Sequence, residues 1–209
     1  MIYKLDCVLT TDGLTDFAKS LGQKVKHVPS NLKYVLDYYS ESLQSASGAV
    51  KYPEHLDQEF TANFPLYKDN FITLKWNIAV ANELIKEYSI SVTTLCINEV
   101  LSSSTVTEVN SSHLDYALKN NNPIIVAEMP QSPTKNIVID GNHRVISRLH
   151  KSYRAIDAHV LQPSIHMLAM SSDLYCVLFG VYFNLAFLLS YMSGKQTMEE
   201  LVRGMYRFN

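Results

Sequence analysis

The sequence has few cysteines for its length: Cys7, Cys96 and Cys176 are the only three in 209 residues. No two of them form a CxxC pair, which excludes a zinc ribbon and a thioredoxin-like redox motif. An odd number of widely spaced cysteines favours reduced thiols in a cytoplasmic protein over a disulfide framework. The chain start also lacks the long apolar stretch of a signal peptide, so we expect a cytoplasmic location.

Positive charge is not in excess either. The chain has 18 Lys and Arg against 20 Asp and Glu, a formal net charge of -2. A protein that binds nucleic acid over its whole surface is usually basic, so this balance excludes that class but leaves room for a local basic patch. The hydrophobic fraction of 47% is ordinary for a globular protein.

Only one long apolar run is present, from Leu174 to Met192, and Asn184 interrupts it. Its length just reaches that of a membrane span. A buried amide in lipid is costly, and Gly180 with several aromatic residues makes a poor span. We therefore expect a helix buried in the core or at a homodimer contact, and no membrane segment.

The first 90 residues carry no recognisable motif, and we expect a helical or irregular extension there. Helical spacing of apolar residues predicts a helix over Leu32–Leu43. Turn-forming residues predict a loop over Tyr52–Asn70. An apolar stripe that includes Trp76 predicts a helix over Leu74–Tyr88.

Residues 91–162 show a different pattern, in which short apolar strands alternate with helical spacing. The predicted order is strand, helix, strand, turn, strand, helix, strand over Val92–Ile97, Ser111–Leu118, Ile124–Ala127, Pro130–Lys135, Ile137–Ile139, Val145–Leu149 and Ala155–Leu161. Residues 163–209 are expected to form helices packed on this core. The sequence thus predicts an α+β fold: a small mixed β-sheet flanked by helices, with helical extensions at both ends.

The chemistry of the chain is concentrated where the strand Ile137–Ile139 ends. Asp140 follows the strand, Gly141 permits a tight turn and close approach of a ligand, and a helix begins directly afterwards. The start of a helix presents backbone N–H groups and a positive dipole end, both suited to phosphate. Arg144 in the first turn is expected to add a bidentate contact, and His143 a further donor.

A basic helix face continues from this turn. Arg144, Arg148 and Lys151 lie on one side of the predicted helix, and Lys135–Arg154 contains five Lys or Arg against one Asp. This asymmetry fits an anionic ligand such as a nucleotide triphosphate. The alternative is that Asp140-Gly141 is a plain turn and the basic residues form a solvated face.

The span from about residue 92 to residue 161, centred on Asp140-Gly141-Asn142-His143-Arg144, resembles the ParB/sulfiredoxin superfamily. ParB-like free serine kinases and many ParB-like proteins carry the same D-G-x-H-R turn. Sulfiredoxins carry G-G-C-H-R, and Asn142 stands here in place of their reactive cysteine, which argues against sulfiredoxin activity. The G-E-R-R sequence that is usual in ParB partition proteins is absent.

The resemblance implies that this turn binds nucleotide phosphates. The candidate nucleotide-binding residues are Gly141, Asn142, His143, Arg144 and Arg148. Asp140 would lie near a metal ion or the phosphate acceptor, and it joins His143, Glu99 and Glu108 as the candidate catalytic residues. No set of dedicated metal ligands is evident, because His150, His159 and His166 are irregularly spaced.

Two functions follow from the resemblance. One is a phosphotransferase that moves phosphate from ATP or ADP, with Mg²⁺, to a small hydroxyl-bearing substrate such as serine. The other is a non-catalytic regulator or DNA-associated protein that uses the nucleotide as a switch. No helix-turn-helix motif for DNA binding is visible after residue 161.

Overall fold

The computed structural model describes residues 5–52, 58–67, 70–101, 111–130 and 135–208. The chain divides into two compact units. The sheet unit contains residues 52–62 and 75–171, and the helical unit contains residues 1–51, 63–74 and 172–209. The units interleave along the sequence, whereas we expected consecutive blocks. The boundaries of independently folding domains near residues 90 and 162 stay a prediction.

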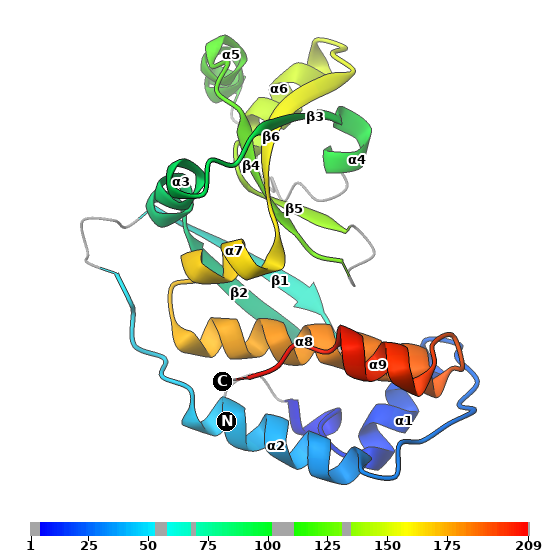
Figure 1. Ribbon diagram of the computed structural model, residues 1–209. Helices are drawn as coiled ribbons and strands as arrows, with labels where there is room; N and C mark the ends of the chain where they lie inside the picture. The colour runs from blue at the N-terminus through cyan, green and yellow to red at the C-terminus, as the bar shows by residue number, and fades with distance from the viewer. Residues whose placement is uncertain (1–4, 53–57, 68–69, 102–110, 131–134, 209) are drawn as a thin grey trace. The chain divides into compact units, whose positions relative to one another are not determined.

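The sheet unit is built on a four-stranded mixed sheet in the order β3-β6-β4-β5. β6 pairs antiparallel with β3 and parallel with β4, and β4 pairs antiparallel with β5. The strands are β3 (Val92–Cys96), β4 (Ile124–Glu128), β5 (Asn136–Asp140) and β6 (Ala155–Leu161). The helices are α3 (Ile78–Glu87), α4 (Ile97–Leu101), α5 (Ser111–Lys119), α6 (Asn142–His150), α7 (Pro163–His166) and the short η3 (Met167–Ala169). This arrangement confirms the predicted α+β class (Figure 1).

Apolar residues bury the central strand β4 on both faces. Ile124 and Val126 belong to one buried cluster with Val138 of β5 and Val145 of α6. Successive strand residues point to opposite faces, so Ile125, which is also buried, faces the other side. The sheet is thereby fixed on both faces where β5 ends at Asp140.

The predicted order of strands and helices from Val92 to Leu161 is confirmed, with ends within a few residues of those expected. The structure adds α4, which follows β3 directly. This region could be predicted from the sequence because the buried strands β4 and β5 are short apolar runs and Asp140-Gly141 is a clear break, and both signals are local.

Two predictions for the first 90 residues are wrong. Tyr52–Asn70 is not all loop, since it contains β1 (Glu59–Pro65), and β1 forms a two-stranded sheet with β2 (Phe71–Asn77). The helix expected from Leu74 begins only at Ile78 as α3. Its start is set by Asn77, whose side-chain oxygen accepts a hydrogen bond from the Val80 N–H and so caps the helix.

The helical unit consists mainly of α1 (Thr11–Ser20), α2 (Leu32–Ser45), α8 (Asp173–Met192) and α9 (Met198–Gly204), with a short η1 (Leu5–Cys7). The predicted helices over Leu32–Leu43 and Leu174–Met192 are confirmed. Asn184 on α8 is 1% exposed, and its amide donates to the Tyr206 carbonyl while its oxygen accepts from the Tyr206 N–H. The amide that interrupts the apolar run therefore holds the segment after α9.

Within the described part of the chain, α8 is the one helix long and apolar enough to cross a membrane. Half of its most apolar window is buried inside the protein. A core helix of a soluble protein meets the same criterion of length and composition, and the burial of Leu178, Leu185 and Met192 fits that role.

Candidate functional site

The turn after β5 has the geometry that the sequence predicts. β5 ends at Asp140, Gly141 has a left-handed backbone with φ of 94°, and α6 begins at Asn142. A Cβ atom on Gly141 would lie 2.5 Å from Cγ2 of Ile124 and 2.8 Å from Nη2 of Arg144. Both the backbone conformation and the close approach of Arg144 therefore require glycine.

Arg144 is the residue whose setting differs most from expectation. Its side chain is only 8% exposed, although we expected a solvent-facing phosphate contact. Nη1 donates to the backbone carbonyls of Asn122 (2.6 Å) and Pro123 (2.8 Å), and Nη2 donates to Oδ2 of Asp140 (2.6 Å). Arg144 thus ties the loop before β4 to the end of β5.

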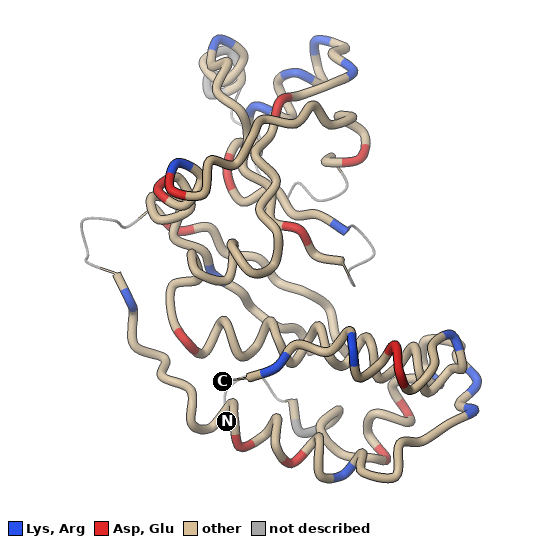
Figure 2. The backbone as a smooth tube through the Cα atoms, in the orientation of Figure 1, with Lys and Arg blue, Asp and Glu red and all other residues tan. Residues whose placement is uncertain are grey.

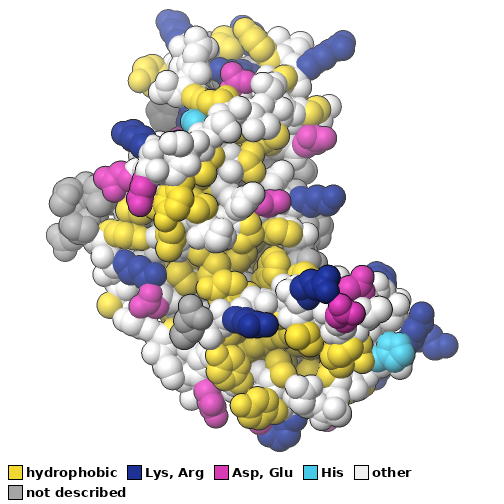
Figure 3. All heavy atoms as spheres, in the orientation of Figure 1, with side chains coloured by type: hydrophobic (Ala, Val, Ile, Leu, Met, Phe, Trp, Pro, Cys, Tyr) yellow, Lys and Arg dark blue, Asp and Glu magenta, His cyan; other side chains and the backbone are white. Residues whose placement is uncertain are grey.

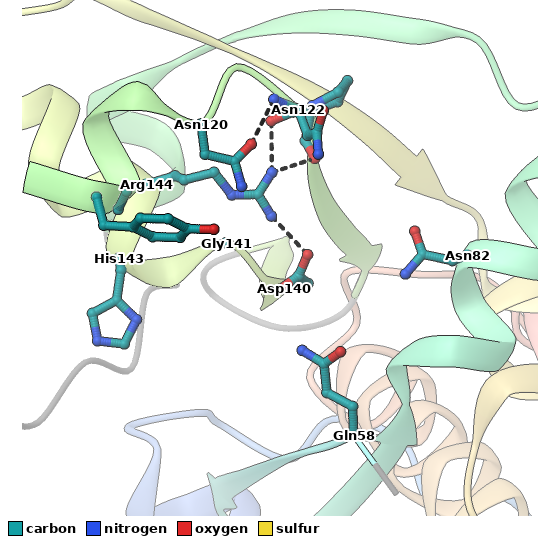
Figure 4. Close-up of a pocket in the computed structure, with 11 residues that line it drawn as sticks. Gln58, Asn82, Asn120, Asn122, Asp140, Gly141, His143 and Arg144 are labelled. Atoms are coloured by element: carbon teal, nitrogen blue, oxygen red, sulfur yellow. Dashed lines mark hydrogen bonds and ion pairs between the residues drawn. The ribbon is translucent and has the colours of Figure 1, made fainter. Parts of the chain in front are cut away.

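An open pocket of about 560 Å³ lies beside this turn (Figure 4). Its lining comes from four segments of the sheet unit: the start of β1, α3, the end of α5 with the following loop, and the β5–α6 turn. The lining residues are Gln58, Asn82, Tyr116, Ala117, Asn120, Asn122, Pro123, Asp140, Gly141, His143 and Arg144. The turn predicted from sequence therefore forms one wall of a pocket that is large enough for a small ligand.

The charges in the pocket are nearly balanced. Asp140 and Arg144 are the only charged side chains among its described lining, and they form an ion pair with each other. The Asp140 side chain remains 29% exposed, and His143 is exposed at the wall. Figure 4 shows the amides of Asn82 and Gln58 on the side facing Asp140. The pocket therefore suits a ligand that is mostly polar, with a small anionic part.

The structure brings four of the predicted site residues to the pocket: Asp140, Gly141, His143 and Arg144. The side-chain amide of Asn142 instead donates to the Val138 carbonyl, 3.0 Å away. This hydrogen bond ties the start of α6 to β5 and so stabilises the turn between them.

Two further predicted site residues, Arg148 and Glu99, are not among the described residues that line the pocket. Nη2 of Arg148 approaches the Asn120 carbonyl at 3.4 Å and Oδ1 of Asn121 at 3.5 Å. Glu99 is exposed on α4, and Glu108 lies outside the described residues. Glu99 remains a candidate catalytic residue on the resemblance alone.

Sequence reasoning missed the polar residues that complete the pocket. These residues are Gln58, Asn82, Tyr116, Asn120 and Asn122. Asn120 and Asn122 follow the predicted helix Ser111–Leu118, where amides serve to end a helix, and Gln58 lies in a segment expected to be loop. The one available signal was the density of amides after α5, which a helix stop alone does not need.

A buried histidine lies elsewhere in the sheet unit. His166 is fully buried, and its Nδ1 accepts from the indole N–H of Trp76 at 3.3 Å. Its Nε2 lies 3.0 Å from the Glu128 carbonyl, so the ring is neutral with the proton on Nε2. Burial lowers the pKa of His166 to about 4. Its partners make it a structural residue.

Comparisons with known protein families, with curated proteins and with solved structures find no match to this chain. The site is therefore interpreted from its own geometry and from the five-residue turn.

Proposed function

We propose that the pocket beside Asp140–Arg144 binds a nucleotide through its phosphates, in a sheet unit that is a ParB/sulfiredoxin-like domain. The observation that carries this proposal is the succession of strand, left-handed glycine and helix start at the wall of an open pocket. A helix of nine residues such as α6 places the positive end of its dipole at that wall.

Arg144 supports an anion at this wall in a way that differs from a flexible surface arginine. Three of its five N–H donors are used by Asn122, Pro123 and Asp140. Among the described residues, Nε–H and the second Nη2–H make no hydrogen bond, and both nitrogens lie beside Gly141. The bonds to Asp140 and to the loop hold the guanidinium rigid, so its orientation costs little entropy when a phosphate binds.

The amides opposite the turn suit the neutral part of a nucleotide. The Asn82 amide nitrogen donates to the Ile78 carbonyl at 3.0 Å, which leaves its oxygen oriented as an acceptor. Amide groups supply both donors and acceptors, as ribose hydroxyls and base edges require. Tyr116 adds an aromatic surface at the same pocket.

The geometry favours binding over catalysis. Asp140 is the only carboxylate among the described lining residues, and Arg144 already neutralises it. If phosphoryl transfer occurs, Asp140 is the residue that would hold Mg²⁺ together with the phosphates, and the ion would neutralise their charge. We place the protein in the cytoplasm, where reduced Cys7, Cys96 and Cys176 are expected.

The experiment is a thermal-shift panel of ATP, ADP, CTP and GTP, each with and without Mg²⁺. A nucleotide that binds the native state raises the melting temperature by mass action. His143→Ala removes an exposed pocket residue and should reduce that rise. The matched control is His150→Ala, an exposed histidine at the other end of α6, which should leave the rise unchanged.

Two results oppose the proposal. Absence of any nucleotide-dependent rise for the wild type would remove it. Equal losses for His143→Ala and His150→Ala would move the site away from the start of α6. Release of ADP from ATP only when a hydroxyl acceptor is present would establish the phosphotransferase form of the proposal.

A further inference from the structure

The basic residues that follow Arg144 in the sequence are not explained by the pocket. Arg148, Lys151 and Arg154 do not line it. Lys119, at the end of α5, is a further cation outside it. Nucleotide binding in the pocket therefore does not explain why these four cations lie where they do.

Hydrogen bonds bring these residues to one end of the sheet unit. α5 and α6 pack against each other. Nη2 of Arg148 lies 3.4 Å from the carbonyl of Asn120, the residue after Lys119. The Tyr153 N–H donates to the Arg148 carbonyl at 3.0 Å, which folds the turn after α6 back onto the helix. We call Lys119, Arg148, Lys151 and Arg154, together with Tyr153, the basic end.

The charge of the basic end is one-sided. The basic end contributes four Lys or Arg, and the nearest acidic residues in the sequence are Asp115 on α5 and Asp157 on β6, in a chain whose net charge is -2. Asp157 follows on β6, where its Oδ1 accepts a hydrogen bond from the Thr94 hydroxyl. Figure 2 shows Lys and Arg gathered over α5 and the turn between α6 and β6. Such a surface attracts a polyanion.

An exposed aromatic ring accompanies these cations. Tyr153, in the turn between α6 and β6, is 55% exposed. Figure 3 shows apolar side chains between the basic ones at this end of the sheet unit. An exposed ring gains nothing for the core, but it offers a flat surface on which an unpaired base stacks.

We propose that the basic end binds single-stranded nucleic acid. Lys119, Lys151 and Arg154 contact phosphates, and a base stacks on Tyr153. A single strand fits better than a duplex, because the bases of a duplex are already stacked on each other and do not reach tyrosine rings. This binding is a second activity of the sheet unit, and it does not depend on the nucleotide pocket.

The test is fluorescence anisotropy with labelled single strands of DNA and of RNA, each about 20 nucleotides long, over a series of salt concentrations. The logarithm of the affinity should fall with the logarithm of salt, by about 0.7 for each phosphate contacted. Lys151→Ala/Arg154→Ala should therefore reduce that slope by roughly 1.4. Tyr153→Ala should weaken binding by roughly tenfold at every salt concentration.

The matched control is Lys33→Ala/Tyr34→Ala on α2, where Tyr34 is 74% exposed and Lys33 is also exposed. This variant removes one cation and one exposed ring from the helical unit and should bind as the wild type does. A loss of affinity equal to that of Tyr153→Ala would overturn the proposal. So would tighter binding to a duplex of equal length, or binding to phosphatidylserine vesicles with none to the single strands.

An added arm separates this proposal from the nucleotide pocket. Saturating ATP should not displace the strand, because the cations tested here do not line the pocket. Complete displacement by ATP would show one shared site and overturn the proposal. Strand binding by a protein that shows no nucleotide-dependent melting rise would remove the proposed function and leave the basic end intact.

Discussion

Arg144 is the residue on which the candidate site depends, and its role is structural as well as electrostatic. Its guanidinium satisfies two backbone carbonyls and pairs with Asp140 while being almost fully buried. A sequence pattern shows that an arginine follows Asp-Gly, but not that its partners Asn122 and Pro123 lie 22 and 21 residues upstream. The burial of Arg144 therefore could not be predicted from the sequence pattern.

Arg144→Ala should weaken nucleotide binding and also destabilise the protein. Removal leaves Asp140 without its partner and two carbonyls unsatisfied, at a cost of roughly 2–4 kcal/mol. Arg148→Ala should cost less, because its bonds at 3.4 and 3.5 Å are long. Urea unfolding of both variants measures the difference. A larger loss for Arg148→Ala would contradict the assigned role of Arg144.

Gly141→Ala should be more damaging than a positive φ alone explains. A left-handed backbone costs a non-glycine residue about 1–2 kcal/mol, and here a Cβ would also meet Ile124 and Arg144. Gly22→Ala is the control, since Gly22 has φ of 69° and no atom within 4 Å of the added Cβ. The difference between the two unfolding free energies reports the crowding. Equal losses would show that the turn has room for a side chain.

His166 should make stability depend on pH. Burial holds its folded-state pKa at about 4, against 6.5 ordinarily, so the unfolded state binds the proton more readily. The contribution of the neutral ring is complete above pH 6.5 and is lost as pH falls towards 4, by roughly 3 kcal/mol in total. Urea unfolding of wild type and His166→Gln between pH 7.5 and 4 tests this, and identical slopes for the two proteins would refute it.

At the scale of elements, local patterns predicted the strands and helices from Val92 onwards and failed for β1 and β2. The strands of the four-stranded sheet are short apolar runs bounded by turn formers. The second half of β2, from Leu74, falls in the predicted helix Leu74–Tyr88, because Trp76 also fits helical spacing with the residues of α3. Asn77 caps α3 and so sets the boundary between β2 and the helix. Such a cap is difficult to recognise inside an apolar stretch.

The apolar helix α8 contains one buried amide, Asn184, whose hydrogen bonds hold a neighbouring segment of the chain. Gly180 and Asn184 lie one turn apart, and a Cβ on Gly180 would lie 2.7 Å from the rings of Tyr206 and Phe208. The glycine makes room for the segment after α9, and Asn184 bonds its backbone. Gly180 and Asn184, which make α8 a poor membrane span by sequence, therefore both serve to pack the segment after α9 against the helix.

Asn184→Leu and Gly180→Ala should both release residues 205–208 from α8. The first removes two hydrogen bonds, and the second displaces two rings, so the routes are independent. Each should lower stability by roughly 1–3 kcal/mol. Hydrogen exchange at Tyr206 measures the release. Unchanged protection in both variants would show that the segment is held elsewhere.

At the scale of the whole molecule, the sequence predicted the α+β class and the place of the candidate turn, but not the interleaving of the two units. Contacts between residues as distant as Lys51 and Asp173, 2.7 Å apart, leave no local trace in the sequence. The pocket has the same character, because its amides come from segments far apart in the chain. Only its Asp140–Arg144 wall is a local motif.

Amide chemical-shift mapping is the most direct test of whether the start of α6 holds nucleotide phosphates. Labelled protein would be titrated with the nucleotide that gives the largest melting rise, with and without Mg²⁺. We expect the largest changes in amide chemical shift at Gly141, Asn142 and His143, and smaller changes at Asn82 and Asn120. Saturation at these positions should follow a single affinity. Changes confined to other parts of the chain, or none at millimolar nucleotide, would contradict the account.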